Sequence, residues 1–336
     1  MIKKSALILA TVPFVLFASC RKETPVKEKE SPLKLFMAEV NHEDSICGKM
    51  DLAFKQKVEE LSDGKILIDL KCSGILGDEA QVMKILQSET PTIHLARISA
   101  SLAKYGGKKS KLLSIPFTFS NAEHFWQFAS SDIAKEIINE PYELKLGMRG
   151  LFYGEEGFRH FFSTEEISGI ADMKGKKTRV SGQVLTDLAK SLGAEPVEIP
   201  FTNIFVSLQT GKIDVAEQPL SNYLADNFHK AAPYIILDGH MLGTVQVVIS
   251  SKTWDSLTEK QQRILTAAGK YASDYCRKIA AESEEKIKAQ LTAEGVKITT
   301  VDDISPWQEA CRKMISESSK DYPELYEKIL KLNSQH

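Results

Sequence analysis

Residues 172–222 decide the fold class, and they read DMKGKKTRVSGQVLTDLAKSLGAEPVEIPFTNIFVSLQTGKIDVAEQPLSN. Three strand-like runs, KKTRVS, EPVEIP and KIDVAEQP, alternate with helix-like segments such as VLTDLAKSLG and NIFVSLQTG. This alternation predicts an α/β architecture in which the strands pair largely in parallel. Arg179 ends the first of these strands, just ahead of the turn at Gly182. From spacing alone, Arg179 is either an exposed charge on an edge strand or a cation that holds an anionic ligand.

The alternation of strands and helices continues on both sides of this stretch. Apolar runs and helical spacing predict strands over 33–40, 65–72 and 93–99, a strand or loop over 112–119, and helices over 47–62, 78–88 and 121–140. Glycine punctuation in LFYGEEGFRHFFS (151–163) indicates a strand pair. YIILDGHMLGTVQVVISS (234–251) is expected to form two strands that return to the first half of the chain.

The C-terminal part of the chain is predicted to be mostly helical. Thr258 and Gln261 match a capping box, and apolar residues recur on one face of the segment that follows. A helix continuing to Ala293 would contain about 35 residues and measure roughly 50 Å at 1.5 Å per residue. A helix of that length is expected to cross two domains. Ser305-Pro306 starts a final helix, with proline in its first turn.

The N-terminus has the pattern of an export signal. Two lysines precede the apolar run SALILATVPFVLFAS (5–19), which ends in small residues before Cys20. FASC looks like a relaxed bacterial lipobox, so 1–19 is predicted to be a signal peptide and Cys20 a lipidated first residue. An unmodified cysteine at an ordinary cleavage site is the alternative. The charged segment that follows makes 20–32 a flexible tether, and we expect a periplasmic or extracytoplasmic protein that is lipid-anchored to a membrane.

Composition and spacing exclude several classes of function. The 336 residues include 43 Lys or Arg and 45 Asp or Glu, and this net charge of -2 offers no electrostatic case for nucleic acid as a partner. The histidines lack the paired spacing of a metal site, and no nucleophile elbow, P-loop or dinucleotide fingerprint is present. We therefore expect no enzymatic activity, no metal and no cofactor. Free, buried thiols are expected at four cysteines, with two disulfides as the alternative: Cys47, Cys72, Cys276 and Cys311.

Several short motifs, in their order and spacing, resemble the solute-binding subunit of TRAP (tripartite ATP-independent periplasmic) transporters, the DctP family. DMKGKKTRV, SLGAEPV and PFTNIFVSLQTGKIDVAEQP match the family's pattern, and VVISSKTWDSLTEKQQRIL matches its usual continuation. Upstream, GFRHFFS resembles the family's G-x-R segment, and SGILGDEAQVMKIL resembles its glycine-rich element. The resemblance covers nearly all of the chain from residue 33 to about residue 275.

The resemblance implies a two-domain periplasmic-binding-protein-like fold, with strands that cross the hinge and a long helix that spans both domains. Domain I is expected to comprise 33–155 plus 244–283, and domain II 156–243 plus 284–336. Such a receptor encloses a small organic acid or other anionic ligand in the interdomain cleft. It then delivers the ligand to the TRAP membrane permease and performs no chemistry on it.

The resemblance also implies which residues contact the ligand. Arg179 falls on the family's signature arginine, whose planar guanidinium can pair with a carboxylate through two parallel hydrogen bonds. Arg159 matches the second basic position of the family, and Phe201 matches an aromatic residue that covers the ligand. Asn41, Glu79 and Arg97 match positions that line the cleft in some relatives. Three arginines in one cleft would suit a dianion, unless internal carboxylates balance them and leave a more apolar pocket.

Each of these positions also has an alternative interpretation. Arg159 could be a solvated loop charge, Phe201 a core residue and Asn41 a turn residue, while Glu79 could stabilise a helix N-terminus. Gln218 stands where the family commonly has asparagine, and it reaches one methylene further, so the identity of the ligand is not carried over. For the whole protein, the alternatives are a hydrophobic or lipid-like ligand, signalling through a partner protein, and an exported α/β enzyme.

Overall fold

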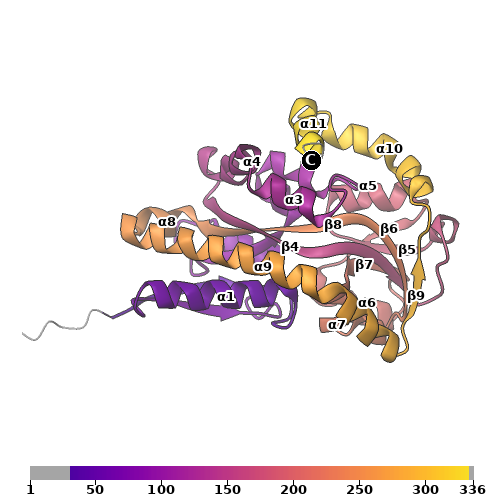
Figure 1. Cartoon of the computed structure of the whole chain (residues 1–336), viewed down its shortest axis with the longest axis horizontal. Coiled ribbons are helices and arrows are strands. Elements are labelled where there is room, and N and C mark those ends of the chain that lie inside the picture. The colour runs from indigo at the N-terminus through magenta and orange to yellow at the C-terminus, as the bar shows by residue number, and fades with distance from the viewer. Residues whose placement is uncertain (1–30, 333–336) are drawn as a thin grey trace, which may run out of the picture. The chain divides into compact units, whose positions relative to one another are not determined.

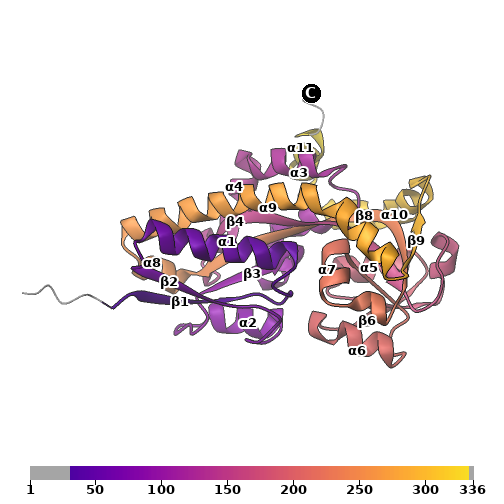
Figure 2. The ribbon, with the colours of Figure 1, turned by 60° about the horizontal axis from the view of Figure 1, so that its bottom comes forward.

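The computed structural model describes residues 31–332, except for the side chains of residues 100 and 101. The predicted signal peptide, Cys20 and most of the predicted tether therefore lie outside the described residues. Among the helices within 31–332, none combines the length and the apolar composition needed to cross a bilayer. The described chain forms two lobes that share one sheet (Figures 1 and 2).

The first lobe begins with strands and helices in alternation. Its elements are β1 (Leu33–Ala38), α1 (Ile46–Leu61), β2 (Ile66–Lys71), α2 (Glu79–Leu86) and β3 (Leu95–Ser99). All five confirm the predictions for this part of the chain. Helix α1 starts where the side chain of Ser45 accepts a hydrogen bond from the backbone N of Gly48 at 3.0 Å. Helix α2 starts at a capping box formed by Asp78 and Gln81.

The rest of the first lobe is more broken than the sequence predicts. It comprises the 3-10 helices η1 (Ala100–Tyr105) and η2 (Lys108–Ser114), followed by α3 (Ala122–Ala129) and α4 (Asp132–Glu143). The single helix predicted over 121–140 is wrong, because the chain restarts its helix at Ser131. The side chain of Ser131 accepts a hydrogen bond from the backbone N of Ala134 at 3.2 Å and so caps α4. Residues 112–119 form no strand: 112–114 end η2, and the loop alternative holds only for 115–119.

The two lobes are joined by two long strands, β4 (Met148–Ser163) and β8 (Tyr234–Ser250). The prediction of a strand pair in each segment is wrong, because each segment is one continuous strand. The register between β4 and β8 shifts between Glu155 and Phe158, and Gly157 has a φ of 90° there. The glycines that suggested strand ends are thus associated with a bulge, which bends a strand without ending it.

The second lobe follows the predicted order. Its elements are the 3-10 helix η3 (Ile170–Met173), β5 (Lys177–Val180), α5 (Gln183–Ser191), β6 (Glu195–Glu198), the 3-10 helix η4 (Phe201–Asn203), α6 (Ile204–Gln209), β7 (Val215–Pro219), α7 (Leu220–Ala225) and the 3-10 helix η5 (Phe228–Lys230). Gly182 joins β5 to α5 with a φ of 101°, a backbone conformation that only glycine adopts at little cost. The turn after Arg179 is therefore fixed by the sequence.

The C-terminal region is mostly helical, as predicted. It contains α8 (Ser251–Ser256), α9 (Glu259–Ala293), β9 (Lys297–Thr300), α10 (Ser305–Ser319) and α11 (Pro323–Lys331). Helix α9 has 35 residues and starts at the capping box of Thr258 and Gln261, which confirms both predictions. The helix that begins at Ser305 is not the final one, since α11 follows it.

The nine strands within the described residues form one mixed sheet, in the order β2-β1-β3-β8-β4-β7-β5-β6, with β9 paired to β8. Strands β1, β2 and β3 pair in parallel, and so do β5, β6 and β7. The central strands β4 and β8 run antiparallel to each other and to their other neighbours in this order. Largely parallel pairing is therefore correct for the outer strands and wrong for the central pair.

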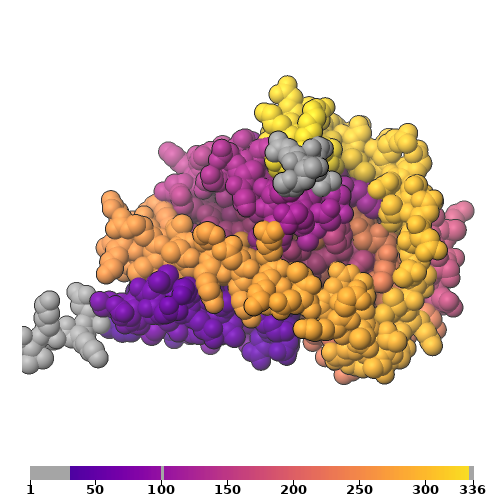
Figure 3. All heavy atoms as spheres, viewed as in Figure 1, coloured from indigo at the N-terminus to yellow at the C-terminus, as the bar shows by residue number. Residues whose placement is uncertain are grey.

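Helix α9 packs on both lobes. Its residues Leu265 and Cys276 belong to the core of the first lobe, whereas Leu291 belongs to a core of the second. The helix approaches β4 closely at Gly269, where a Cβ atom would lie 2.6 Å from the Cδ1 of Phe152. In the space-filling view, α9 runs beside α1 on one face (Figure 3). The helix therefore spans both lobes, while the residue boundaries of the two domains stay a prediction.

The four described cysteines are free. Cys47, Cys276 and Cys311 are buried, whereas Cys72 is only half-buried. The expectation of buried thiols is therefore correct for three of these positions and too strong for Cys72.

Candidate ligand-binding site

A small cavity of about 170 Å³ lies between the lobes. The first lobe lines it with residues at the carboxyl ends of β1 and β3, and the second lobe with residues of β4, β5, β7 and η4. In open α/β sheets, ligands commonly bind outside the carboxyl ends of the parallel strands. All seven residues singled out from the sequence line this cavity: Asn41, Glu79, Arg97, Arg159, Arg179, Phe201 and Gln218.

Arg179 is buried in the cavity wall, with only 4% of its surface exposed. Its Nε donates a hydrogen bond to the backbone oxygen of Ile199 at 2.9 Å. Among the described residues, the carboxylate that pairs with it is that of Glu217, whose Oε1 lies 3.7 Å from Nη1, beyond hydrogen-bonding distance. Burial lowers the pKa of Arg179 to about 10, and Glu217 opposes that shift. At pH 7, Arg179 is thus a buried cation with unused hydrogen-bond donors.

Arg97, in the opposite wall, is fully paired. Its Nε donates to Oε2 of Glu39 at 2.8 Å, and its Nη2 donates to Oε1 of the same carboxylate. Its Nη1 also lies 3.3 Å from Oε1 of Glu156. Burial opposes the charge on Arg97, yet Glu39 holds its pKa above the ordinary value. The guanidinium of Arg97 is therefore occupied by protein carboxylates.

Arg159 is paired in a similar way, which rules out its interpretation as a solvated loop charge. Its Nε and Nη2 donate to the two carboxylate oxygens of Glu217, the latter bond at 2.9 Å. Its Nη1 lies 3.4 Å from Oε2 of Glu156. Burial alone would raise the pKa of Glu217, but Arg159 and His240 outweigh it and lower that pKa to about 2. Glu217 is ionised at any physiological pH.

Glu156 connects the two lobes at the point where β4 passes between them. Its Oε1 accepts a hydrogen bond from Nδ2 of Asn41 in the first lobe at 3.0 Å. Its Oε2 accepts one from Nδ2 of Asn222 in the second lobe at 3.3 Å. Because Arg97 and Arg159 also approach it, Glu156 links polar groups from both walls of the cavity.

The other predicted residues line the wall in different ways. Glu79 accepts hydrogen bonds from the backbone N and the hydroxyl of Ser99, at 3.2 and 3.1 Å, and so holds the end of β3. Phe201 starts η4 and packs edge-to-face against Phe228, with ring centroids 5.8 Å apart. Gln218 is buried, and its Oε1 accepts a hydrogen bond from Asn222 at 3.3 Å.

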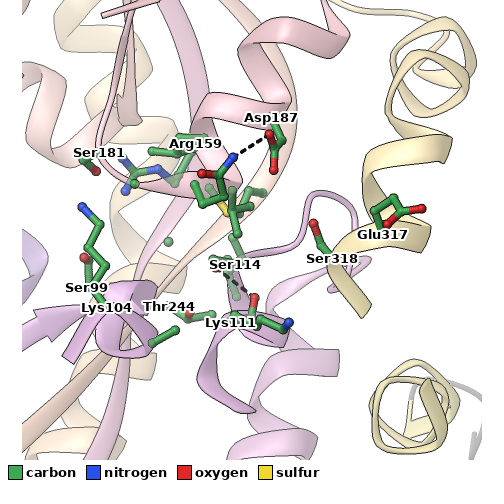
Figure 4. A pocket seen from close by; sticks show the side chains of 18 of the residues that line it. Ser99, Lys104, Lys111, Ser114, Arg159, Ser181, Asp187, Thr244, Glu317 and Ser318 are labelled. Carbon is green, nitrogen blue, oxygen red and sulfur yellow. Dashed lines mark hydrogen bonds between the residues drawn. The ribbon is translucent and has the colours of Figure 1, made fainter. Parts of the chain in front are cut away.

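A larger cavity of about 530 Å³ shares four lining residues with the small one: Ser99, Lys104, Arg159 and Ser181. Apolar side chains from η1, α5 and β8 form part of its wall: Ala103, Val184, Leu185, Met241 and Leu242. Arg159, Ser181 and Lys104 stand at one side of this cavity, and Glu317 and Ser318 of α10 at the other (Figure 4). The small cavity thus adjoins a roomier and more apolar space.

Sequence reasoning missed the carboxylates that neutralise the arginines. Glu39 directly follows the first strand, and Glu156 is part of the unusual pair GEEG inside an apolar strand. That pair was a usable signal, because a buried acid needs either a cationic partner, as Glu156 has in Arg97, or a raised pKa, as Glu155 has. Lys104 and Asn222 were missed as well. No metal centre emerges, since no group of three or more His, Cys, Asp or Glu side chains within residues 31–332 could hold an ion.

Comparison with known proteins agrees with this geometry. The profile of the family described as "Bacterial extracellular solute-binding protein, family 7" (DctP) matches residues 37–321. A solute-binding protein of Roseobacter denitrificans is 28% identical over 250 residues, which are 74% of this chain and 76% of that protein. The C4-dicarboxylate-binding periplasmic protein DctP of Shewanella loihica is 28% identical over 265 residues, covering 78% of this chain and 77% of that protein.

A solved structure shows the same fold. The sugar acid binding protein DctPAm of Advenella mimigardefordensis, in complex with galactonate, superimposes with a TM-score of 0.85 at 25% sequence identity. The match covers 91% of this chain and 99% of that protein.

Proposed function

This chain belongs to the DctP family of bacterial extracellular solute-binding proteins, and on that premise we propose that it binds an organic ligand through a carboxylate at Arg179 and delivers it to a TRAP membrane permease. The members of the family are solute-binding receptors. One observation above all supports a carboxylate on the ligand: Arg179 is a buried cation, and within residues 31–332 the carboxylate paired with it, that of Glu217, is 3.7 Å away. A ligand carboxylate at this position would supply the missing hydrogen-bond acceptor.

The position of the cavity supports a cleft that closes around its ligand. Residues from both lobes line the cavity, and Glu156 accepts hydrogen bonds from each lobe. A ligand that contacts Arg179 in one lobe and Asn41 or Glu79 in the other stabilises the closed arrangement more than an open one. Closure then follows from differential affinity, and the permease would recognise the closed receptor through surfaces of both lobes.

The predicted anchor at Cys20 fits this role. A lipid attached to Cys20, followed by the tether, would hold the receptor at a membrane face and raise its effective concentration near the permease. The extracytoplasmic location follows from the family. The lipid is testable separately, because Cys20→Ser should release the protein from the membrane fraction and leave the binding of its ligand unchanged.

A second candidate ligand is favoured by the larger cavity. Its apolar wall of Val184, Leu185 and Met241 would suit a carboxylate whose remaining part is apolar or lipid-like. In that case the carboxylate would still lie at Arg179, and the chain would extend past Arg159 into the larger space. This candidate changes the ligand and leaves the receptor function the same.

A thermal-shift series tests the proposal. The purified protein is heated with galactonate, glucuronate, pantoate, succinate and octanoate, and at least one acid should raise its melting temperature. Arg179→Ala should abolish that shift while the apo protein still unfolds cooperatively. Arg263→Ala provides the matched control, because Arg263 lies on the exposed face of α9 with 72% of its side chain accessible. If a ligand raises the melting temperature of Arg179→Ala as much as that of the wild type, the proposal is contradicted. If octanoate alone raises the melting temperature of the wild type, the second candidate ligand is favoured.

A further inference from the structure

Six of the buried charged residues lie in the wall of the small cavity or directly behind it, where Asp51 and His240 are also buried. We call them the charge cluster: Glu39, Arg97, Glu156, Arg159, Arg179 and Glu217. The three arginines and Glu156 line the cavity, whereas Glu39 and Glu217 lie behind the lining. Counted at their formal charges, the three arginines and three glutamates of the charge cluster sum to zero. The cavity therefore contains three arginines without being a strongly positive site.

The three arginines of the charge cluster are not equally paired with its carboxylates. Arg97 is held through two hydrogen bonds by Glu39, and Arg159 is held through two by Glu217. Glu156 approaches both of these arginines, at 3.3 and 3.4 Å. Arg179 makes no comparable contact, because its closest approach to Glu217 is 3.7 Å. One arginine is available to a ligand, and two are already used.

We propose that the cleft selects ligands that carry a single carboxylate, and that Glu39 is a specificity-determining residue because it keeps Arg97 from receiving a second one. The inference rests on the proposed function, in which Arg179 binds the first carboxylate. Burying a carboxylate costs free energy unless a cation offsets the lost hydration, and a second carboxylate would lose its hydration without gaining a free cation. Its nearest neighbours would include the carboxyl group of Glu156, which also lines the cavity and lies 3.3 Å from Arg97.

Lys104 is the other cation in the lining of the small cavity. Its Nζ lies 3.6 Å from Oε1 of Glu198, and 36% of its side chain is exposed. An ammonium group at the rim of the cavity is screened by water and already has a carboxylate beside it. It therefore does not replace the buried Arg97 as a receptor for a second carboxylate. The relative from Shewanella loihica is named for C4-dicarboxylates, so this preference would distinguish the chain from that protein.

The inference is tested with matched pairs of acids that differ by one carboxylate. Galactonate and galactarate share their carbon skeleton and hydroxyl configuration, as do gluconate and glucarate, and butyrate and succinate form a short pair. Isothermal titration calorimetry gives the affinity of the protein for each acid. The wild type should bind the monocarboxylate of any pair that it recognises at least 100-fold more tightly than the dicarboxylate. This comparison needs no variant and so does not depend on the folding of one.

Glu39→Gln then tests the role of Glu39. The substitution keeps the shape of the side chain and raises the formal charge of the cluster from zero to plus one. The ratio of monocarboxylate to dicarboxylate affinity should fall at least tenfold. Glu165→Gln, which removes an exposed carboxylate paired with Lys176, should leave the ratio unchanged.

The outcomes separate the two proposals. Dicarboxylates that bind as tightly as their partners, or more tightly, would overturn the single-carboxylate inference and leave the receptor function intact. A preference for monocarboxylates that survives Glu39→Gln unchanged, in a folded variant, would overturn the assignment of Glu39. If none of these six acids and no acid of the thermal-shift series binds, the carboxylate receptor itself is contradicted, and the inference fails with it.

Discussion

The two walls of the cleft use the same side chain for different purposes. In the first lobe, the guanidinium of Arg97 is paired with the carboxylate of Glu39 and is part of the protein's internal polar network. In the second lobe, Arg179 is just as buried, but among the described residues a backbone oxygen is its one partner within hydrogen-bonding distance. The contrast shows that the type and burial of a residue do not identify a ligand contact. What identifies it is whether the side chain already has a partner.

The largest effect should come from removing each arginine in turn. Arg97→Met leaves Glu39 as a buried carboxylate without its partner, so the free energy of unfolding should fall by about 3–5 kcal/mol. Arg179→Met removes a buried cation that lacks a close partner, so the apo protein should change by less than about 1 kcal/mol or become more stable. Urea denaturation of the ligand-free proteins measures both. Equal losses in the two variants would show that Arg179 is a structural residue like Arg97.

The second prediction concerns the carboxylate behind the second-lobe wall. The pKa of Glu217 lies at about 2 in the folded protein, below its ordinary value of 4.5. A group with a depressed folded pKa contributes stability above its unfolded pKa and loses it as the pH falls toward the folded pKa. Glu217 should thus contribute about 3 kcal/mol at pH 7, and this contribution should disappear between about pH 5 and pH 2.

Glu217→Gln isolates that contribution. Unfolding free energies of the wild type and the variant, measured at pH 7 and pH 3, should differ much less at pH 3 than at pH 7. A difference that stays constant with pH would mean that the carboxylate of Glu217 is not the group that titrates. Glu165→Gln serves as the exposed control, with a small effect at either pH.

The smallest effect concerns the hinge that joins the two walls. Gly157 has a φ of 90°, and a Cβ atom placed there would meet no atom within 4 Å, so Gly157→Ala adds backbone strain without a clash. The cost should be about 1 kcal/mol. Gly211 is a matched control outside the hinge, with a φ of 68° and equally open surroundings. Both variants should lose similar stability, but only Gly157→Ala should alter ligand affinity. Identical affinities would show that this bulge plays no part in closure.

Much of the fold could be predicted because local signals were strong. The long helix was fixed by its capping box and apolar stripe, and the strand ending at Arg179 by the glycine turn after it. The predictions of secondary structure are wrong where one local sequence feature is compatible with two structures. Gly157 reads as a strand end but forms a bulge, because the partner strand continues the pairing on either side. That information comes from β8, about eighty residues further along the chain, and not from the local sequence.

The candidate site shows the same limit. All seven predicted residues line one cavity, since the family pattern specifies which strand ends meet. The partners of the arginines could not be predicted, because Glu39 and Arg97 meet only when β1 and β3 pair side by side. Two alternatives remained open from the sequence. The three arginines could bind a dianionic ligand, or carboxylates of the protein could neutralise them. The bonds to Glu39 and Glu217 favour the second alternative for Arg97 and Arg159, and Arg179 is the exception.

The most direct test of the account is to identify what the protein retains when it is purified. The wild type, Arg179→Met and Arg263→Met are purified in parallel and denatured. Mass spectrometry of each extract then gives the amount of released ligand per mole of protein. A carboxylic acid should be present in the wild type and in Arg263→Met, and it should be absent from Arg179→Met. The same compound at the same stoichiometry in Arg179→Met would contradict the claim that Arg179 holds the ligand.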